Sequence, residues 1–298
     1  MQREFLGVYY GMKIKKLAPR SPEFPEKLRQ IPQPPKELFY LCQDINKIWE
    51  RPAVAVVGSR KVTPYGRQVT TKLARELASS GIVIVSGLAL GVDGLAHEAA
   101  LEAGGLTVAV MPCGLNRIYP AAHHSLARRI LLAGGALISE YPETNEPRDF
   151  QFVARNRLVA GLSRGVLITE AAEKSGSLHT ANFALEQGKE VFAVPGNITS
   201  LNSTGTNNLI KAGAAPVTEA SDILDALGLT PSEAPKPELL AANEQEHKIL
   251  VLLADGISDG ETLLKQSQLP TQLFNHTLSM LEISGKVKSL GAGQWGLQ

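Results

Sequence analysis

Residues 52–87 read PAVAVVGSRKVTPYGRQVTTKLARELASSGIVIVSG, and this stretch decides the fold. It holds two short apolar runs on either side of one amphipathic segment, at 54–57 and 82–85. Thr63 is placed to cap a helix that begins at Pro64, and Gly81 is placed to end it. Strands this uniformly apolar are buried on both faces, so the stretch predicts one β-α-β unit of a parallel sheet.

The same alternation continues toward residue 228. Four more apolar runs alternate with helical segments, at 107–111, 136–138, 166–169 and 191–194. Glycines follow the helical segments, as is usual where helices end. We therefore predict an α/β domain over 52–228, with an extended Rossmann-like, doubly wound and mostly parallel sheet of five or six β-α units.

The regions outside this domain differ in composition. Residues 12–50 are Pro-rich, which excludes a long helix there, and we expect an N-terminal entry segment over 1–51. Met12 offers a second start, so residues 1–11 are expected to be a leader or a start-site artefact. Prolines mark a linker over 229–243. Three short helical patterns and a hairpin over 244–298 predict a small C-terminal winged-helix domain.

Composition excludes several classes of protein. Thirty basic residues against 29 acidic ones and 44% hydrophobic residues are typical of a soluble globular protein, and a net charge of +1 favours no class of partner. Only Cys42 and Cys113 are present, which excludes a disulfide framework and a cysteine zinc site. We find no export signal and no membrane-spanning run, so we expect a cytoplasmic protein.

Ligands of an open parallel sheet bind beyond the carboxyl ends of its strands. The residues at these ends are rich in glycine and serine, which let backbone N–H groups and hydroxyls approach a ligand. They are Gly58, Ser59, Ser86, Gly87, Ser175, Gly176 and Ser177. We predict that this edge binds phosphate groups.

The class of phosphate ligand is indicated by the nucleotide-binding motifs that are absent and by the cationic residues near these strand ends. No Gly-x-Gly-x-x-Gly fingerprint follows the first strand, and no P-loop motif occurs in the sequence, which disfavours dinucleotide redox chemistry and P-loop ATP hydrolysis. Cations expected on separate loops take their place: Arg60, Lys61, Arg117, Arg155, Arg157 and Lys174. They suit a ligand with several phosphates, such as a nucleic acid. Tyr119, Phe150 and Phe152 either stack on bases or pack in the core.

No catalytic constellation is convincing. Asp93 and His97 lie four residues apart and form either an acid/base pair or a helix cap with a hydrogen-bonded neighbour. We favour the second interpretation because no nucleophile or third ligand has a place nearby. Glu170 either takes part in catalysis or binds backbone or arginine groups. Cys113 is expected to be an inert, small hydrophobic residue. We therefore predict no catalytic residue, no metal, no cofactor and no enzymatic activity.

Several motifs in order resemble the DNA-processing protein A (DprA/Smf) family over residues of about 20–225. They are Gly58-Ser-Arg60, Ser86-Gly-x-Ala89-x-Gly-Val-Asp93, Ser139-Glu140-Tyr-Pro142, Arg155-Asn-Arg157, Ser175-Gly-Ser177 and Pro195-Gly-Asn197. The tail is similar to the family's winged helix. The resemblance implies a homodimeric single-stranded DNA-binding protein that protects incoming DNA and loads RecA recombinase in natural transformation, with no established reaction.

The resemblance also implies roles for single residues. Arg60 would be the main phosphate-binding cation, with these residues in or beside the same pocket: Ser59, Ser86, Gly87, Arg155, Asn156 and Arg157. Lys174 follows from its place beside the Ser-Gly-Ser turn. Val153 departs from the family, which usually has proline there, and Ala121 and His123 also depart, so part of the family's positive surface is expected to be absent.

An alternative function is a nucleotide-processing enzyme of the nucleoside-monophosphate glycosidase type. Against it, the residues after Asn197 lack the second glycine, the threonine and the glutamate of the phosphate loop in such enzymes.

The C-terminal domain is acidic, with four basic and six acidic residues and a net charge of −2. Its candidate recognition helix contains no Lys or Arg, and Leu273, Leu278 and Leu281 are expected to face its own core.

Overall fold

The computed structural model describes residues 12–230, 243–254, 257–284, 286–291 and 293–297. The chain divides into two compact units between residues 234 and 235, and each unit is described by itself.

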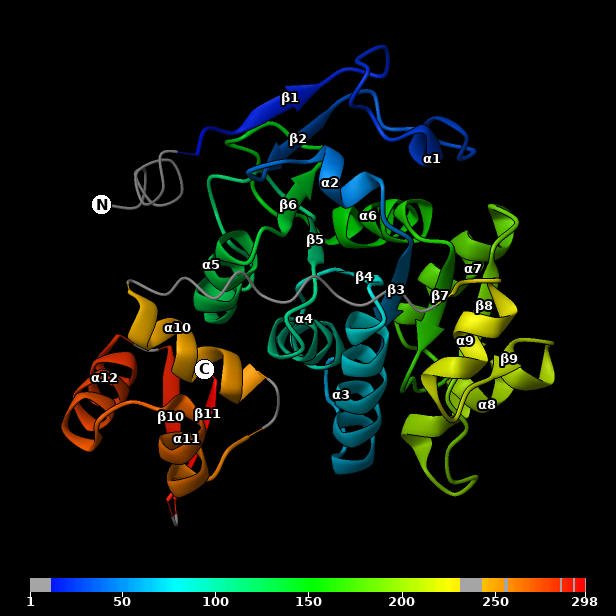
Figure 1. Ribbon diagram of the computed structural model, residues 1–298. Helices are drawn as coiled ribbons and strands as arrows, with labels where there is room; N and C mark the ends of the chain where they lie inside the picture. The colour runs from blue at the N-terminus through cyan, green and yellow to red at the C-terminus, as the bar shows by residue number, and fades with distance from the viewer. Residues whose placement is uncertain (1–11, 231–242, 255–256, 285, 292, 298) are drawn as a thin grey trace. The chain divides into compact units, whose positions relative to one another are not determined.

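The described residues of the first unit form a nine-stranded sheet (Figure 1). Its strands are β1 (Lys15–Leu17), β2 (Leu38–Leu41), β3 (Ala53–Val57), β4 (Val83–Ser86), β5 (Thr107–Met111), β6 (Ala136–Ser139), β7 (Gly165–Ile168), β8 (Glu190–Ala193) and β9 (Ala215–Pro216). Their order is β1-β2-β6-β5-β4-β3-β7-β8-β9. Strands β3 to β9 pair in parallel, which confirms the predicted mostly parallel α/β fold.

Strands β1 and β2 come from the segment expected to lead into the domain. Strand β2 pairs antiparallel with β6, with Tyr40 opposite Ile138, and β1 pairs antiparallel with β2. Two one-turn helices lie in the same segment, α1 (Glu26–Arg29) and α2 (Asn46–Trp49). This region therefore extends the sheet at one edge.

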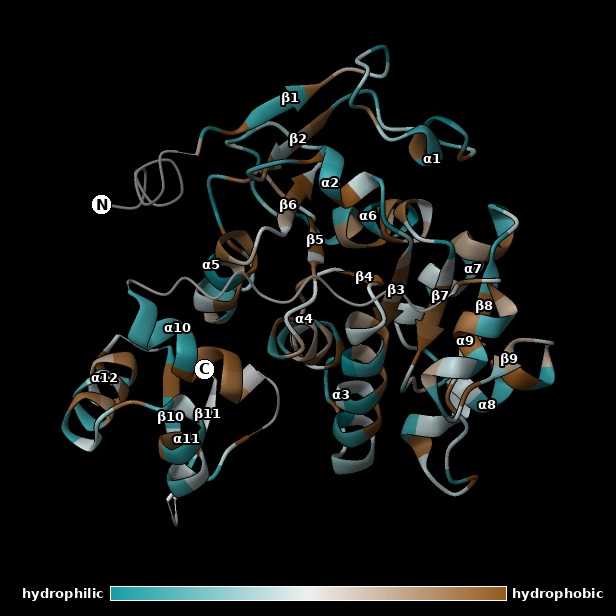
Figure 2. Ribbon diagram, in the orientation of Figure 1, coloured by the Kyte–Doolittle hydropathy of each residue, from teal (hydrophilic) through white to brown (hydrophobic). Residues whose placement is uncertain are grey.

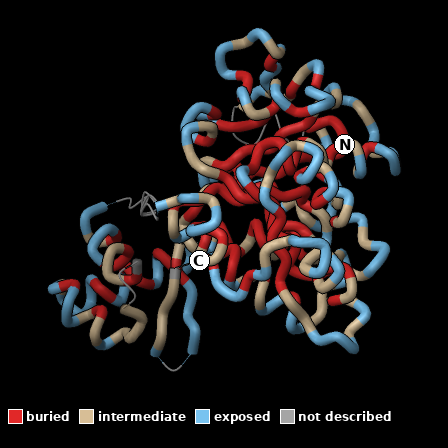
Figure 3. Tube along the Cα trace, turned by 90° about the vertical axis from the view of Figure 1, so that its right-hand side faces the viewer, coloured by how far each residue is buried: buried red, intermediate tan, exposed pale blue. Residues whose placement is uncertain are grey.

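Helices cover both faces of the sheet. One face carries α3 (Pro64–Ser79), α4 (Val92–Glu102), α5 (His124–Leu132) and α9 (Ala220–Ala226), and the other carries α6 (Asp149–Leu162), α7 (Ser177–Glu186) and α8 (Thr204–Lys211). Alternate residues of β3 enter the two cores: Val54 packs with α3 and α4, whereas Ala55 packs with α6 and α7. Figure 2 shows apolar residues in the strands of the sheet, and Figure 3 shows buried residues through the centre of the first unit, as expected for a sheet that helices cover on both faces.

Helix α3 shows how local sequence sets an element. The Thr63 side chain accepts a hydrogen bond from the Gly66 backbone at 3.0 Å, and Pro64 is the first helical residue. Leu73 and Leu77 point into the core, and Gly81 follows the helix with a φ of 80°. The predicted start and end of this helix are confirmed.

The strand order reverses beside β3. From β3 the chain runs outward through β4, β5 and β6, then returns to place β7 on the opposite side of β3. The loops that follow β3 and β7 therefore lead away to different sides. This topological switch point leaves a crevice outside the carboxyl ends of the two strands.

The second unit contains three helices and a hairpin. They are α10 (Glu244–Ala254), α11 (Gly260–Ser267), α12 (Thr271–Ile283), β10 (Val287–Gly291) and β11 (Gln294–Leu297). This order agrees with the expected elements, while the winged-helix assignment stays a prediction. Leu278 and Leu281 are buried as expected, but Leu273 is exposed because Phe274, four residues before Leu278, occupies that core position.

Candidate nucleic-acid interface

A groove of about 580 Å³ lies at the switch point and gathers most of the predicted site residues. We call it the carboxyl-edge groove. Ten predicted residues line it: Gly58, Ser59, Arg60, Lys61, Arg155, Asn156, Lys174, Ser175, Gly176 and Ser177. They come from the loops that follow β3 and β7, from the first residue of α7 and from the middle of α6. Their binding roles stay predictions.

Glu170 holds the loop that follows β3. Its backbone carbonyl accepts from Ser59 N at 2.8 Å, and its buried carboxylate accepts from Thr63 N at 3.2 Å and from the Thr63 hydroxyl at 2.5 Å. A Cβ on Gly58 would lie 2.7 Å from the Glu170 carbonyl, so only glycine permits this close approach. Of the two interpretations left open for Glu170, the structure favours binding of backbone groups.

Three exposed cations surround the groove without ion-pair partners among the described residues. They are Arg60, Lys61 and Lys174. The Arg60 guanidinium lies over the Phe152 ring, with 5.3 Å between Cζ and the ring centroid. Phe152 in turn meets Tyr119 edge-on at 5.2 Å. Cations and ring faces therefore stand side by side at the groove.

Arg155 forms the floor of the groove. It is 4% exposed, and its Nη1 donates to the carbonyls of Gly87, at 2.6 Å, and Val110. Burial lowers the pKa of Arg155 to about 10, with nearby Asp93 opposing and Arg60 adding to the fall. The guanidinium therefore stays charged at neutral pH and adds a fixed positive charge beneath Arg60.

Asp93 and His97 are each engaged in the fold. The Asp93 carboxylate accepts from Gly87 N at 3.0 Å and Ala89 N at 3.4 Å, so it holds the loop before α4. Burial raises the pKa of Asp93, and Arg155 opposes that rise. His97 is fully buried, with Nδ1 2.6 Å from the Thr107 hydroxyl, and burial lowers its pKa to about 3. This arrangement favours structural roles over an acid/base pair.

Three predicted residues do not line the groove: Ser86, Gly87 and Arg157. The buried Ser86 hydroxyl donates to the Val56 carbonyl at 2.7 Å, and Gly87 lies beneath Arg155, where a Cβ would meet its guanidinium at 2.3 Å. Arg157 instead forms two hydrogen bonds to the Glu140 carboxylate, at 2.7 and 2.6 Å.

The position of Arg157 corrects the expectation that Arg155 and Arg157 lie on a loop. Both belong to helix α6, where residues two apart point to nearly opposite sides. Arg155 therefore reaches the groove and Arg157 turns away from it. Arg117 is similarly occupied, since it forms an ion pair with Glu146 at 3.3 Å.

The sequence did not identify every residue at the groove. Ala89, Thr180 and Asn202 also line it, and Asn202 belongs to the 3₁₀ turn η2 (Leu201–Ser203) beyond β8. The only signal was the Pro195-Gly-Asn197 turn before that segment. Cys113 is buried, and burial raises the pKa of its thiol to about 11, as expected for an inert cysteine.

The part of the chain that the structure describes lacks two kinds of feature. No three His, Cys, Asp or Glu side chains come together in a way that could hold a metal ion. No helix in the described part of the chain has the length and apolar character needed to cross a bilayer.

Comparisons with known proteins agree with this fold. Residues 15–228 match the family model of DNA recombination-mediator protein A. Protein Smf of Escherichia coli is 41% identical over 248 residues, which cover 80% of this chain and 66% of that protein, so this chain spans just under two thirds of that relative.

Two solved structures are also similar to this chain. DNA processing protein A from Streptococcus pneumoniae has a TM-score of 0.66 and 40% identity, over 72% of this chain and 74% of that one. DNA processing protein A from Helicobacter pylori, described as having a unique single-stranded DNA binding mode, has a TM-score of 0.64 and 38% identity, over 72% and 95%. The chain belongs to the DNA recombination-mediator protein A family.

Proposed function

We propose that this protein binds single-stranded DNA in the carboxyl-edge groove and passes it to RecA recombinase during natural transformation, protecting the strand meanwhile. One observation carries the DNA-binding part: Arg60, Lys61 and Lys174 stand exposed and unpaired, among the described residues, around a glycine- and serine-rich backbone. Such a surface suits a chain of phosphates.

The rings beside Arg60 favour a single strand over a duplex. The Phe152 ring contacts both Arg60 and Tyr119, and Tyr119 is 41% exposed. Unpaired bases offer their faces to such rings, whereas bases of a duplex are stacked on one another. The DNA-binding mode described for the H. pylori relative supports the same choice.

We further propose that the protein acts as a homodimer, loads RecA and catalyses no reaction. The family membership supports these points. The alternative, a nucleotide-processing enzyme, is not favoured. Among the described residues that line the groove, Asp93 is the only one with a carboxylate, and its side chain holds the Gly87 and Ala89 backbone. If the protein released the base from any of a panel of nucleotides, the enzyme alternative would be supported instead.

The test compares labelled single-stranded DNA, duplex DNA and RNA of one length by gel shift, with and without RecA. We expect the single strand to bind most tightly and the protein to speed assembly of RecA on it. Equal binding of duplex and single strand would contradict the proposed ligand. Tight strand binding without an effect on RecA would contradict only the proposed partner.

A further inference from the structure

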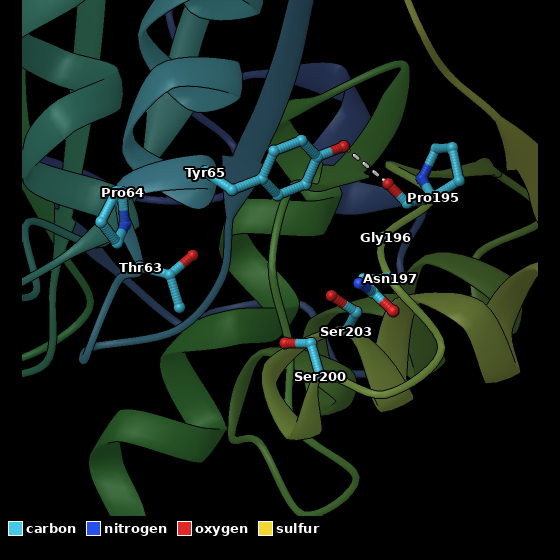
Figure 4. A pocket seen from close by; sticks show the side chains of 8 residues that line it. All are labelled: Thr63, Pro64, Tyr65, Pro195, Gly196, Asn197, Ser200 and Ser203. Atoms are coloured by element: carbon cyan, nitrogen blue, oxygen red, sulfur yellow. Dashed lines mark hydrogen bonds between the residues drawn. The ribbon is translucent and has the colours of Figure 1, made fainter.

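A second hollow, of about 600 Å³, opens at the same edge of the sheet (Figure 4). We call it the Tyr65 hollow. One wall is the start of α3, and the other is the segment between β8 and α8. Its lining residues are Thr63, Pro64, Tyr65, Pro195, Gly196, Asn197, Ser200 and Ser203.

The lining is neutral and offers ring faces. None of the eight residues carries a charge, so the hollow has nothing to bind a phosphate by charge. The Tyr65 hydroxyl donates to the Pro195 carbonyl at 2.7 Å and joins the two walls, as Figure 4 shows. The ring nevertheless remains 45% exposed. A flat, weakly polar group is the ligand that suits such a surface.

Three polar groups of the hollow have no hydrogen-bond partner among the described residues. They are the hydroxyls of Ser200 and Ser203 and the amide nitrogen of Asn197, whose oxygen is held by Thr199 at 2.8 and 3.0 Å. The wall beneath them is fixed, because the Asn207 side chain binds both backbone groups of Gly196 at 3.1 and 3.0 Å. The hollow therefore presents free donors and acceptors on a rigid frame.

The hollow adjoins the carboxyl-edge groove at two places along the chain. Asn202 lines the groove and the next residue, Ser203, lines the hollow. Lys61 lines the groove, and Thr63 lines the hollow two residues later, a separation of less than about 8 Å. A strand whose phosphate contacts Lys61 therefore has one of its bases within reach of the Tyr65 ring.

We propose that the Tyr65 hollow receives a nucleobase of the strand whose phosphates lie in the carboxyl-edge groove. The base stacks on the Tyr65 ring, and its polar edge bonds Asn197, Ser200 or Ser203. This inference rests on the proposed function and adds a neutral base subsite to a charged phosphate groove. Because serine hydroxyls and an amide accept more than one base pattern, the subsite favours a base over an empty sugar without reading sequence.

The test uses two labelled oligonucleotides of equal length, one of deoxythymidine and one with abasic sites along it. For Tyr65→Ala we expect affinity for the base-bearing strand to fall about 5- to 150-fold, the range for one stacked base, and affinity for the abasic strand to stay unchanged. Tyr65→Phe keeps the ring and should retain most of the affinity. An equal loss on both strands, or no loss on the first, would overturn the proposal.

Two further measurements separate failure of the base subsite from failure of the proposed function and from misfolding of the variant. If wild-type protein binds neither strand, the proposed function fails, whatever Tyr65 does. Should Tyr65→Ala not fold, DNA carrying 5-iodouracil is cross-linked to the wild-type protein, and we expect the cross-linked peptide to contain Tyr65. Cross-links confined to Tyr119, Phe150 or Phe152 would overturn the proposal. Binding of free thymidine that depends on Tyr65, without any effect on strands, would overturn the placement of a strand base here.

Discussion

Arg60 and Phe152 meet at the carboxyl-edge groove, with the guanidinium carbon 5.3 Å from the ring centroid, although they lie in separate elements of the fold. Tyr119 also contacts the Phe152 ring, with 68° between the two ring planes. A guanidinium stacked on a ring has fewer orientations to lose when it binds a phosphate. Phosphate binding and base stacking are therefore brought to one place.

Replacing Arg60 by alanine should weaken binding of single strands of unrelated sequence. Loss of a charge-assisted hydrogen bond to phosphate costs about 1.5–3 kcal/mol, so we expect a rise in Kd of about 10- to 150-fold in fluorescence anisotropy. Arg129→Ala, which removes an exposed cation of α5 outside the groove, is the control and should change little. Unchanged affinity of the Arg60 variant would exclude Arg60 from the binding site.

Replacing Phe152 by leucine should also weaken binding, because it removes the ring under Arg60 and one face for a base. We expect a loss of about 1–3 kcal/mol on base-bearing strands. The double variant Arg60→Ala, Phe152→Leu should lose less than the sum of the two single variants, because the residues act together. Additive losses in this double-mutant cycle would show that the two side chains contribute independently.

The slope of the binding constant against salt concentration should give the number of phosphates that the protein contacts. Three exposed cations line the groove, and each phosphate neutralised on a single strand contributes a slope of about −0.7, so log K against log salt should fall with a slope near −2. Lys174→Gln should make the slope less steep by about 0.7. Lys211→Gln, an exposed lysine outside the groove, should leave it unchanged. A flat salt response would mean that these cations do not bind phosphates.

Local signals predicted the parts of the fold that depend on neighbours in the chain. The cap at Thr63, the proline after it and the apolar run of β3 are all read within a few residues, and all are confirmed. The groove residues next to β3 and β7 followed from the rule that sites lie at strand ends. The edge strands β1 and β2 gave no such signal, because each is only three or four residues long. Strand β2 depends on pairing with distant β6, and β1 depends on pairing with β2.

The site residues were harder to predict where their role depends on the direction in which a side chain points. Arg155 and Arg157 look equivalent in the sequence, and only the helical phase of α6 sends one to the groove and the other to Glu140. Asn202 lines the groove because of the course that the chain takes after β8, and no local sequence pattern predicts that course. Glu170 could not be assigned either, because its role depends on the loop that folds over it.

Acid should destabilise the first unit through His97. Burial, together with nearby His123 and Arg155, lowers the folded-state pKa of His97 from 6.5 to about 3. The unfolded chain therefore binds more protons than the folded one between these values, so stability is intact above pH 6.5 and falls as pH drops toward 3.

Chemical unfolding at a series of pH values should detect this effect. Between pH 6 and pH 4 the His97 contribution is about 1.4 kcal/mol per pH unit. We expect the free energy of unfolding of His97→Gln, whatever its value at neutral pH, to fall less steeply in this range than that of the wild type. His179→Gln, at an exposed position, should keep the wild-type slope. Parallel curves for His97→Gln and the wild type would contradict the assignment.

The second unit is poorly suited to bind phosphate. Two of the four lysines over 244–298 are occupied, since Lys286 pairs with Glu246 at 2.6 Å and Lys248 with Glu244 at 3.0 Å. Helix α12 contains no Lys or Arg and buries Phe274, so it offers no basic face. A net charge of −2 over 244–298 repels a polyanion rather than attracting it.

A chain that ends near Leu229 should therefore keep most of its affinity for single strands. The groove is built entirely from residues before that point, and Leu227 and Leu229 pack on the core of the first unit. Anisotropy titrations of the truncated and full-length chains at one salt concentration make the comparison, with circular dichroism to verify that the truncated chain is folded. The removed unit would then serve contacts with another protein or regulation. A loss of more than about tenfold, or 1.4 kcal/mol, would show instead that the acidic unit contributes to DNA binding.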